Sequence, residues 1–175
     1  MLGRFVALIA LTASLLLPAN ADAVAASVEV AFSPDRGATD LVVHTIESAK
    51  SSIRVAAYSF TSKPIAQALL EANRHGIDVR VVVDKSNATA RYTAATFLAN
   101  QGVSVRVDYH YAIMHNKFVV VDGATVETGS FNYTSAAEHK NGENVLVLHD
   151  PAIAQRYAKE WERLWGESEE MKARY

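Results

Sequence analysis

The sequence contains no cysteine and no surplus of basic residues. Its 175 residues include 17 Lys and Arg against 19 Asp and Glu, which gives a formal net charge of −2 at pH 7. Without cysteine, disulfides and a thiol-linked lipid anchor are both excluded, so the fold depends on its hydrophobic core alone. A negative net charge is not typical of a nucleic-acid-binding protein and argues mildly against that class.

The sequence also lacks an apolar run long enough to span a bilayer comfortably. A basic residue precedes its N-terminal apolar stretch, Phe5 to Leu17, and small residues follow it. This pattern is typical of a secretory signal peptide, with cleavage after Ala21 or Ala23. We therefore expect a leader over residues 1–23 and one mature domain over 24–175. The mature protein would be periplasmic or secreted in a bacterium, with no stable attachment to the membrane.

Apolar periodicity in the mature chain alternates between strand and helix spacing. About 150 residues are enough for one substantial core. Strands are predicted at 28–32, 52–60, 78–84, 103–107 and 144–149, and helices at 40–49, 64–75, 92–100 and from 151 onward. This alternation predicts an α/β fold. In the last helix a stripe of apolar side chains predicts a core-facing side rather than a ligand site. The stripe consists of Ile153, Tyr157, Trp161 and Leu164.

The segment HNKFVVVDGATVETGSFN, residues 115–132, predicts a β-hairpin. Asp122 and Gly123 separate an apolar run from a second strand-like segment, and an Asp-Gly pair in that position is a strong signal for a two-residue turn. The pairs expected from this turn are Val121 with Ala124, Lys117 with Thr128, and His115 with Ser130.

Four polar side chains converge on this predicted hairpin: His115, Lys117, Ser130 and Asn132. Residues two apart project from the same face of a strand. A histidine can attack phosphorus and carry it covalently, while lysine and amide groups hold the nonbridging oxygens and neutralise developing charge. This scheme needs neither a metal ion nor a cofactor. Asp122 falls on the opposite face, so we expect it to form an Asx-type turn rather than to contact phosphate.

At these residues the chain resembles the phospholipase D superfamily. The signature of that superfamily, HxKxxxxDxxxxxxGSxN, is matched here by His115, Lys117, Asp122, Gly129, Ser130 and Asn132. Six matches at fixed spacing make a specific motif, whereas HxK alone would carry almost no weight. Further segments, among them AAYSFTSKPIAQAL and GIDVRVVVDKSN, resemble small EDTA-resistant bacterial endonucleases of the superfamily. The likeness therefore covers nearly the whole mature chain.

The resemblance implies a mixed β-sheet flanked by helices on both faces, with one signature per chain. It also implies a homodimer in which the signatures of two chains meet, because a two-histidine mechanism needs a second subunit here. By the same likeness, Glu143 is the carboxylate that orients the histidine. The implied activity is metal-independent phosphodiester hydrolysis through a phosphohistidine.

The expected substrate is DNA, cut with little sequence preference, and RNA offers the same phosphodiester. A local cationic cleft would have to offset the negative net charge, and its candidate residues are Lys63, Lys85, Arg91 and Lys140. The close alternative is a phospholipase D or cardiolipin-type hydrolase, and a more distant one is a degenerate module that binds without cutting. The intact signature and the lack of an evident membrane-docking segment favour the nuclease.

A metal cluster of Asp108, His110 and His115 is also conceivable, but these residues offer too few ligands for a closed site. Lys117 already supplies the positive charge that a divalent ion would bring. We therefore expect no metal ligands here. His110 either lines the substrate groove or is simply exposed.

Overall fold

A computed structural model describes residues 27–90 and 92–172. The leader predicted over residues 1–23 lies outside the described residues, and so does Arg91. The strands are β1 (Ser27–Ser33), β2 (Ser52–Ala57), β3 (Asp78–Asp84), β4 (Ser104–Asp108), β5 (Lys117–Val121), β6 (Thr125–Gly129), β7 (Glu143–His149) and β8 (Glu169–Glu170). The helices are α1 (Ala38–Glu47), α2 (Lys63–Arg74), α3 (Ser86–Thr89), α4 (Ala94–Asn100), α5 (Ser135–His139) and α6 (Pro151–Glu167).

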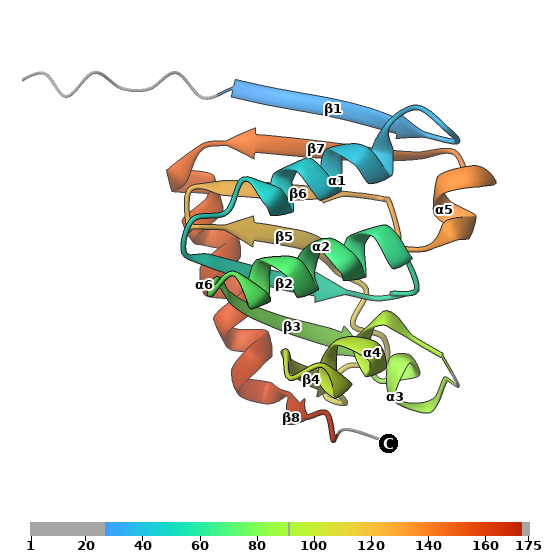
Figure 1. Cartoon of the computed structure of the whole chain (residues 1–175), viewed down its shortest axis with the longest axis vertical. Helices are drawn as coiled ribbons and strands as arrows, with labels where there is room; N and C mark the ends of the chain where they lie inside the picture. Colours follow the sequence, from blue (N-terminus) through green and yellow to red (C-terminus); the bar gives the residue numbers. More distant parts are fainter. Residues whose placement is uncertain (1–26, 91, 173–175) are drawn as a thin grey trace, which may run out of the picture.

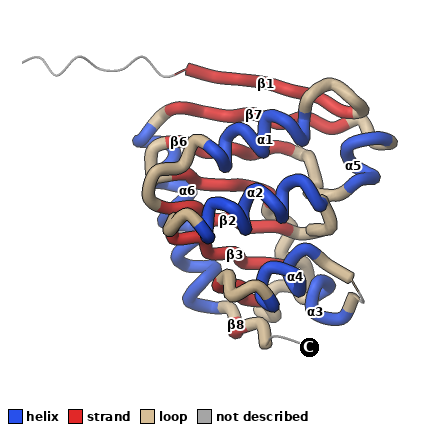
Figure 2. The backbone as a smooth tube through the Cα atoms, viewed as in Figure 1, coloured by secondary structure: helices blue, strands red, loops and turns tan. Residues whose placement is uncertain are grey.

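The strands form one mixed sheet in the order β1-β7-β6-β5-β2-β3-β4-β8. β2, β3 and β4 run parallel, while all other neighbours in the sheet are antiparallel. Figure 1 and Figure 2 show α1, α2 and α4 across one face of this sheet and α6 across the other. The predicted α/β class, with a mixed sheet and helices on both faces, is therefore confirmed.

Each face of the sheet has its own hydrophobic layer. α1, α2 and α4 cover one face with a continuous buried layer. α6 buries Trp161 and Leu164 against the other face, with Ile153 and Tyr157 packed beside them. The indole Nε1 of Trp161 donates to the backbone oxygen of Val55 at 2.8 Å. The apolar stripe predicted on this helix therefore faces the core. Among the described residues, no helix combines the length and apolar character that a membrane span needs.

The β5–β6 hairpin forms, but its register differs by one residue from the predicted one. Val121 pairs with Thr125 rather than with Ala124. Asp122 and Gly123 take the positive φ values expected of the turn, 52° and 64°. The turn closes through Ala124 N, which donates to Val121 O at 3.0 Å, so Ala124 becomes a third loop residue and the ladder starts one position later. The other predicted pairs, Lys117 with Thr128 and His115 with Ser130, are therefore wrong as well.

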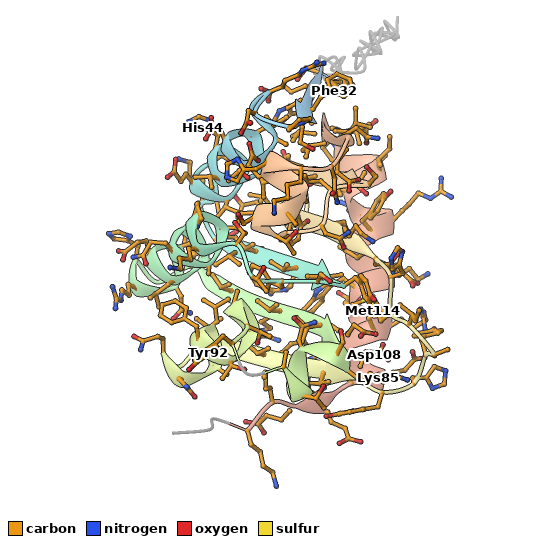
Figure 3. All side chains as sticks on the ribbon, turned by 90° about the vertical axis from the view of Figure 1, so that its right-hand side faces the viewer. Phe32, His44, Lys85, Tyr92, Asp108 and Met114 are labelled. Carbon is orange, nitrogen blue, oxygen red and sulfur yellow. The ribbon has the colours of Figure 1, made fainter. Side chains whose placement is uncertain are left out.

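One end of the sheet collects the segments that carry the signature. β2, β3, β4 and β6 finish at this end, and β5 and β7 begin there. Figure 3 looks onto it and shows Lys85, Asp108 and Met114 together, from the ends of β3 and β4 and from the segment before β5. Nothing in the sequence predicts α3 and β8, because elements of four and two residues are too short to show a period.

Candidate active site

Five of the predicted site residues lie at this end of the sheet. His115 comes just before β5, which begins with Lys117. Ser130 follows β6 directly, Asn132 comes two residues later, and Glu143 opens β7. Since β5, β6 and β7 are adjacent in the sheet, these side chains come from three neighbouring strand ends.

The side chains of His115 and Lys117 form a close pair. Lys117 Nζ lies 3.2 Å from His115 Nδ1 and donates to His115 O at 2.8 Å. The Tyr58 ring, just after β2, packs against the His115 ring with centroids 4.6 Å apart, and its centroid lies 5.4 Å from Lys117 Nζ. Both contacts help to orient the imidazole and the ammonium. Nothing in the sequence singles out Tyr58, because one tyrosine after a strand makes no motif.

Lys117 is only 7% exposed, which is unusual for a lysine. Burial lowers its pKa, and the Glu143 carboxylate nearby opposes that shift. An ammonium that has lost part of its hydration interacts more strongly with an anion than a fully exposed one does. Lys117 is therefore well placed to bind a phosphate oxygen.

Ser130 and Glu143 are tied together within the chain. Ser130 Oγ donates to Glu143 Oε2 at 2.5 Å and accepts from Asn144 N at 3.1 Å. Asn141 Nδ2 donates to the other carboxylate oxygen, Oε1, at 3.1 Å. The carboxylate is thereby held at the edge of the site. Among the described residues it has no hydrogen bond to His115 of the same chain.

The glycine of the signature is required by packing. A Cβ atom at Gly129 would lie 2.2 Å from the backbone oxygen of Asn144 and 3.0 Å from its carbonyl carbon. Gly129 pairs with Val145, so the missing side chain lets β6 approach β7 closely. This approach brings the next residue, Ser130, within reach of Glu143.

Asn132 faces away from the core, unlike its two neighbours. Phe131 and Tyr133 are 1% and 0% exposed, and because alternate residues of an extended segment face opposite ways, Asn132 faces outward. The backbone oxygen of Tyr133 accepts from Thr61 N and Ser62 N, each at 2.8 Å, which fixes the segment against the loop after β2. The Oδ1 atom of Asn132 is buried and has no hydrogen-bond partner among the described residues.

A buried acid lies beneath the signature. Glu127 of β6 is 1% exposed, and burial raises its pKa to about 8, although the hydrogen bond from Tyr133 OH acts in the opposite direction. That bond is 2.5 Å long and ends on Oε2, while Oε1 has no partner in the described part of the chain. Glu127 is therefore protonated at neutral pH. It links β6 to the segment that carries Asn132, and it falls at an unspecified position of the signature.

Asp122 lies at the opposite end of β5 from His115. Its carboxylate accepts four hydrogen bonds of 2.8 Å, from Lys50 N, Ser51 N, Ser51 Oγ and Ser52 N. Burial would raise the pKa of Asp122, but these bonds outweigh burial and lower it. The aspartate of the signature is thus a clamp between the hairpin and the start of β2, rather than the Asx turn expected. The structure does not bring it to the other five residues.

Three of the four basic residues expected near the site are described. Lys85 Nζ donates to the backbone oxygen of Tyr111 at 3.0 Å, so it supports the loop that leads to the signature. Lys63 lines a pocket between α2 and α4. Lys140 is exposed and directly follows α5.

Two buried carboxylates bind backbone N–H groups of the loop that precedes His115, the candidate catalytic histidine. Asp84 Oδ2 accepts from Met114 N at 2.9 Å, immediately before His115. Asp108 Oδ1 accepts from His110 N at 2.8 Å, and His110 itself is exposed. Both acids therefore act on the backbone of the loop and so help to position His115.

The described residues contain one group of acids and histidine close enough to share an ion, namely Asp35, Glu138 and His139. His139 Nδ1 already pairs with Asp35 Oδ1 at 2.7 Å, and Glu138 Oε2 accepts from Thr39 N at 3.0 Å. These bonds join the turn after β1 and the first turn of α1 to α5, so each member of the group already has a hydrogen-bond partner within the chain. Asp108, His110 and His115 do not form such a group within the described residues.

Known proteins share this sequence pattern. A family model described as "Cardiolipin synthase, PLD-like domain" matches residues 42–165. Phospholipase D of Rickettsia conorii is 34% identical over 134 residues, which cover 77% of this chain and 67% of that protein. Mitochondrial cardiolipin hydrolase of Xenopus laevis is 41% identical over 119 residues, which cover 68% of this chain and 57% of that protein. The matched residues thus span roughly three fifths to two thirds of these curated relatives.

Solved structures share the fold. The phospholipase D family member Nuc from Salmonella typhimurium has a TM-score of 0.80 and 42% identity, covering 83% of this chain and 97% of that chain. NucT from Helicobacter pylori has a TM-score of 0.75 at 22% identity, covering 82% and 98%, and bears on the fold alone. Fold and site together define a phosphodiester hydrolase. The chain belongs to the phospholipase D superfamily.

Proposed function

We propose that this chain is a metal-independent DNA endonuclease that works through a phosphohistidine, in a homodimer with a shared active site. The observation that carries the proposal is the pairing of the exposed His115 with Lys117, beside the bonded Ser130 and Glu143. The first pair offers a nucleophile with a cation for phosphate, and the second offers a fixed carboxylate. The likeness to small EDTA-resistant bacterial endonucleases supports the same function, as does the intact signature, which favours an enzyme over a module that only binds.

The proposed reaction has two displacement steps. In the first, Nε2 of His115 attacks phosphorus, the bond to the leaving oxygen breaks, and His115 of the partner subunit donates a proton to that oxygen. In the second, the same partner histidine, now neutral, takes a proton from water as the water attacks phosphorus and releases the first histidine. Lys117 and Asn132 hold nonbridging oxygens throughout, and Ser130 supports Glu143.

The position of the proton on the neutral imidazole of His115 indicates that the second subunit has to supply a hydrogen-bond acceptor. A lysine ammonium can only donate, so His115 Nδ1 is the acceptor of its bond with Lys117, and the neutral ring then carries its proton on Nε2. Attack by Nε2 requires the proton on Nδ1 instead, with an acceptor facing it. Within its own chain, Glu143 bonds to Ser130 and Asn141 and, among the described residues, has no hydrogen bond to His115. We therefore assign the role of acceptor to Glu143 of the partner subunit.

An apolar strip on β1 offers a surface for the second copy. Val28, Val30 and Phe32 alternate along this strand and are 55%, 53% and 49% exposed. β1 is an edge strand, and its last residue, Ser33, pairs with Glu143. Phe32 lies at the upper edge of the molecule in Figure 3. A second copy docked on this β1 strip would cover the exposed apolar side chains and reach the Glu143 edge of the site.

Phospholipid hydrolysis is the second candidate function. The names of the curated relatives, phospholipase D and mitochondrial cardiolipin hydrolase, favour it. The loop before His115 favours it too, because Tyr109 and Ile113 are 49% and 54% exposed there. Exposed apolar side chains beside a phosphodiester site suit contact with a lipid surface. Turnover of cardiolipin vesicles together with inactivity on DNA would reverse the ranking.

The test of the nuclease is plasmid cleavage by residues 24–175 in excess EDTA, beside the variants His115→Ala and His44→Ala. His44 is an exposed histidine on α1, on the opposite side of the molecule from Met114 in Figure 3, and serves as the matched control. Cleavage by the native chain and by His44→Ala, with none by His115→Ala, is the expected result. Activity that vanishes in EDTA and returns with a divalent ion would contradict the phosphohistidine mechanism.

A further inference from the structure

A pocket of about 520 Å³ opens between α2 and α4. Its lining includes Thr61, Lys63, Gln67, Tyr92, Phe97 and Asn100, and we refer to it as the α2–α4 pocket. Its volume falls in the range of about 300–1,000 Å³ that is typical of small-molecule sites. None of the residues assigned above to phosphate chemistry lines it, so the proposed reaction does not account for it.

The α2–α4 pocket combines aromatic surface with polar groups. Tyr92 is 78% exposed and Phe97 is 41% exposed, both large fractions for aromatic side chains. Tyr92 lies on the helix side of the molecule in Figure 3. Lys63 and Gln67, whose side chains end in an ammonium and an amide, also line this mostly apolar pocket. A nucleobase has two flat faces that stack on aromatic rings and a polar edge that forms hydrogen bonds, and its phosphate attracts a nearby cation.

The pocket is joined to the proposed active site through its wall. Thr61 N and Ser62 N, both in that wall, donate to the backbone oxygen of Tyr133 at 2.8 Å. Tyr133 directly follows Asn132, and consecutive Cα atoms are only about 3.8 Å apart. A strand whose phosphate is held by Asn132 can therefore place a base in the pocket within a few nucleotides of that phosphate.

We propose that the α2–α4 pocket binds a nucleobase of a single-stranded nucleic acid, stacked on Tyr92 and Phe97, close to the phosphodiester that is cut. This inference rests on the proposed nuclease function and adds a strand preference to it. Bases of a duplex are paired and stacked, so they enter such a pocket only after extrusion. Single strands are therefore bound better than duplexes of the same sequence.

The test compares a labelled oligothymidine, its duplex with oligoadenine, and bis(4-nitrophenyl) phosphate, all in excess EDTA. Stacking on aromatic side chains is worth about 1–3 kcal/mol per base, so the double variant Tyr92→Ala/Phe97→Ala should raise KM for the single strand about 5- to 150-fold, with kcat nearly unchanged. Hydrolysis of bis(4-nitrophenyl) phosphate, which is too small to fill both sites, should stay at the native rate. The matched variant Tyr92→Phe/Phe97→Tyr keeps both rings and should retain the native KM.

The outcomes separate the pocket from the nuclease function. If the native chain and the alanine double variant cut the single strand with the same KM, the nuclease stands and the pocket inference is wrong. An equal loss on bis(4-nitrophenyl) phosphate would also overturn the inference, because the substitutions would then have damaged the catalytic site. A native chain that hydrolyses phospholipid vesicles and cuts no nucleic acid would instead remove the proposed function. A loss confined to long-chain phospholipids would assign the pocket to an acyl chain.

Discussion

Two residues within the signature segment, Lys117 and Glu127, have perturbed pKa values, and burial is the first cause of both shifts. Burial disfavours the charged form, so it lowers the pKa of the lysine and raises that of the acid to about 8. Lys117 faces the site, where a bound phosphate would stabilise the charged form of the ammonium. Glu127 faces the core and stays neutral at physiological pH.

The buried Glu127 should make folding stability depend on pH. Its pKa is about 8 in the folded chain against an ordinary value of 4.5, so between these values only the folded state holds the proton. Stability from this group is complete below about pH 4.5 and falls by about 1.4 kcal/mol per unit as the pH rises toward 8. Glu127→Gln should remove this slope in urea unfolding at several pH values, whereas Glu47→Gln, at an exposed position on α1, should keep it. Parallel slopes for native chain and Glu127→Gln would contradict a protonated Glu127.

The two histidines of the proposed dimer should give a bell-shaped pH profile. One His115 must be neutral to attack, and the other must be protonated to donate, and histidine is the side chain that most readily changes its charge near neutral pH. The measurement is kcat/KM for bis(4-nitrophenyl) phosphate from about pH 5 to 9. A flat profile over this range would argue against paired acid and base roles.

At the scale of the elements, close contacts between strands place the signature residues. Gly129 permits the approach of β6 to β7, and Asp122 fastens the other end of the hairpin to β2. Both are signature residues, yet neither needs to touch the substrate. Some positions of the motif are therefore determined by strand packing, and others by the chemistry of the site.

Replacement of Gly129 by alanine should disturb Ser130 and Glu143 together. The added Cβ would clash with the backbone oxygen of Asn144 at 2.2 Å, so β6 and β7 must separate. Overpacking of this kind costs about 1–3 kcal/mol in the free energy of unfolding, and kcat should fall as well. The control is Gly166→Ala in α6, where a Cβ meets nothing within 4 Å and helix propensity should improve by up to about 1 kcal/mol. Native kcat in a folded Gly129→Ala variant would show that the site tolerates the separation.

Loss of the Asp122 clamp should affect stability more than chemistry. Asp122→Ala removes the acceptor of three backbone N–H groups at the start of β2. Water can replace it at the exposed Lys50 and Ser51, so the expected cost in urea unfolding is about 0.5–1.5 kcal/mol. Because its folded pKa is lowered, the contribution of Asp122 is present above the ordinary value of 3.8 and is lost as the pH falls through the lowered folded value. Well below the unfolding temperature, kcat should remain near native. A large loss of kcat at unchanged stability would instead point to a catalytic role.

At the scale of the whole molecule, one chain holds one signature and one histidine of the proposed pair. The β1 strip, with Val28, Val30 and Phe32 exposed, is the apolar surface next to the Glu143 edge of the site. An unpaired edge strand with exposed apolar side chains tends to associate. Dimerisation would cover this strip and complete the site in one step.

A charge on the strip should separate the subunits and abolish activity. Val30→Asp is expected to shift the protein from dimer to monomer in light scattering, with the far-UV circular dichroism of a folded chain and almost no DNA cleavage. His44→Asp places the same charge on the outer side of α1 and should leave dimer and activity intact. A native protein that is fully active as a monomer would disprove the shared site.

The α/β class, most helices and strands, and four residues of the candidate site follow from the sequence, because periodicity, turn chemistry and fixed motif spacing are local properties. The four are His115, Lys117, Ser130 and Asn132, whereas Glu143 is expected from the family resemblance alone. Tertiary structure alone decided the register of the hairpin, which shifted by one residue when Ala124 joined the turn. It also decided the contacts of Tyr58 with His115 and of Tyr133 with Glu127, and the binding of Asp122 to Ser52, 70 residues away. These contacts depend on which strands become neighbours and on what is buried between them, and no local pattern in the chain encodes either.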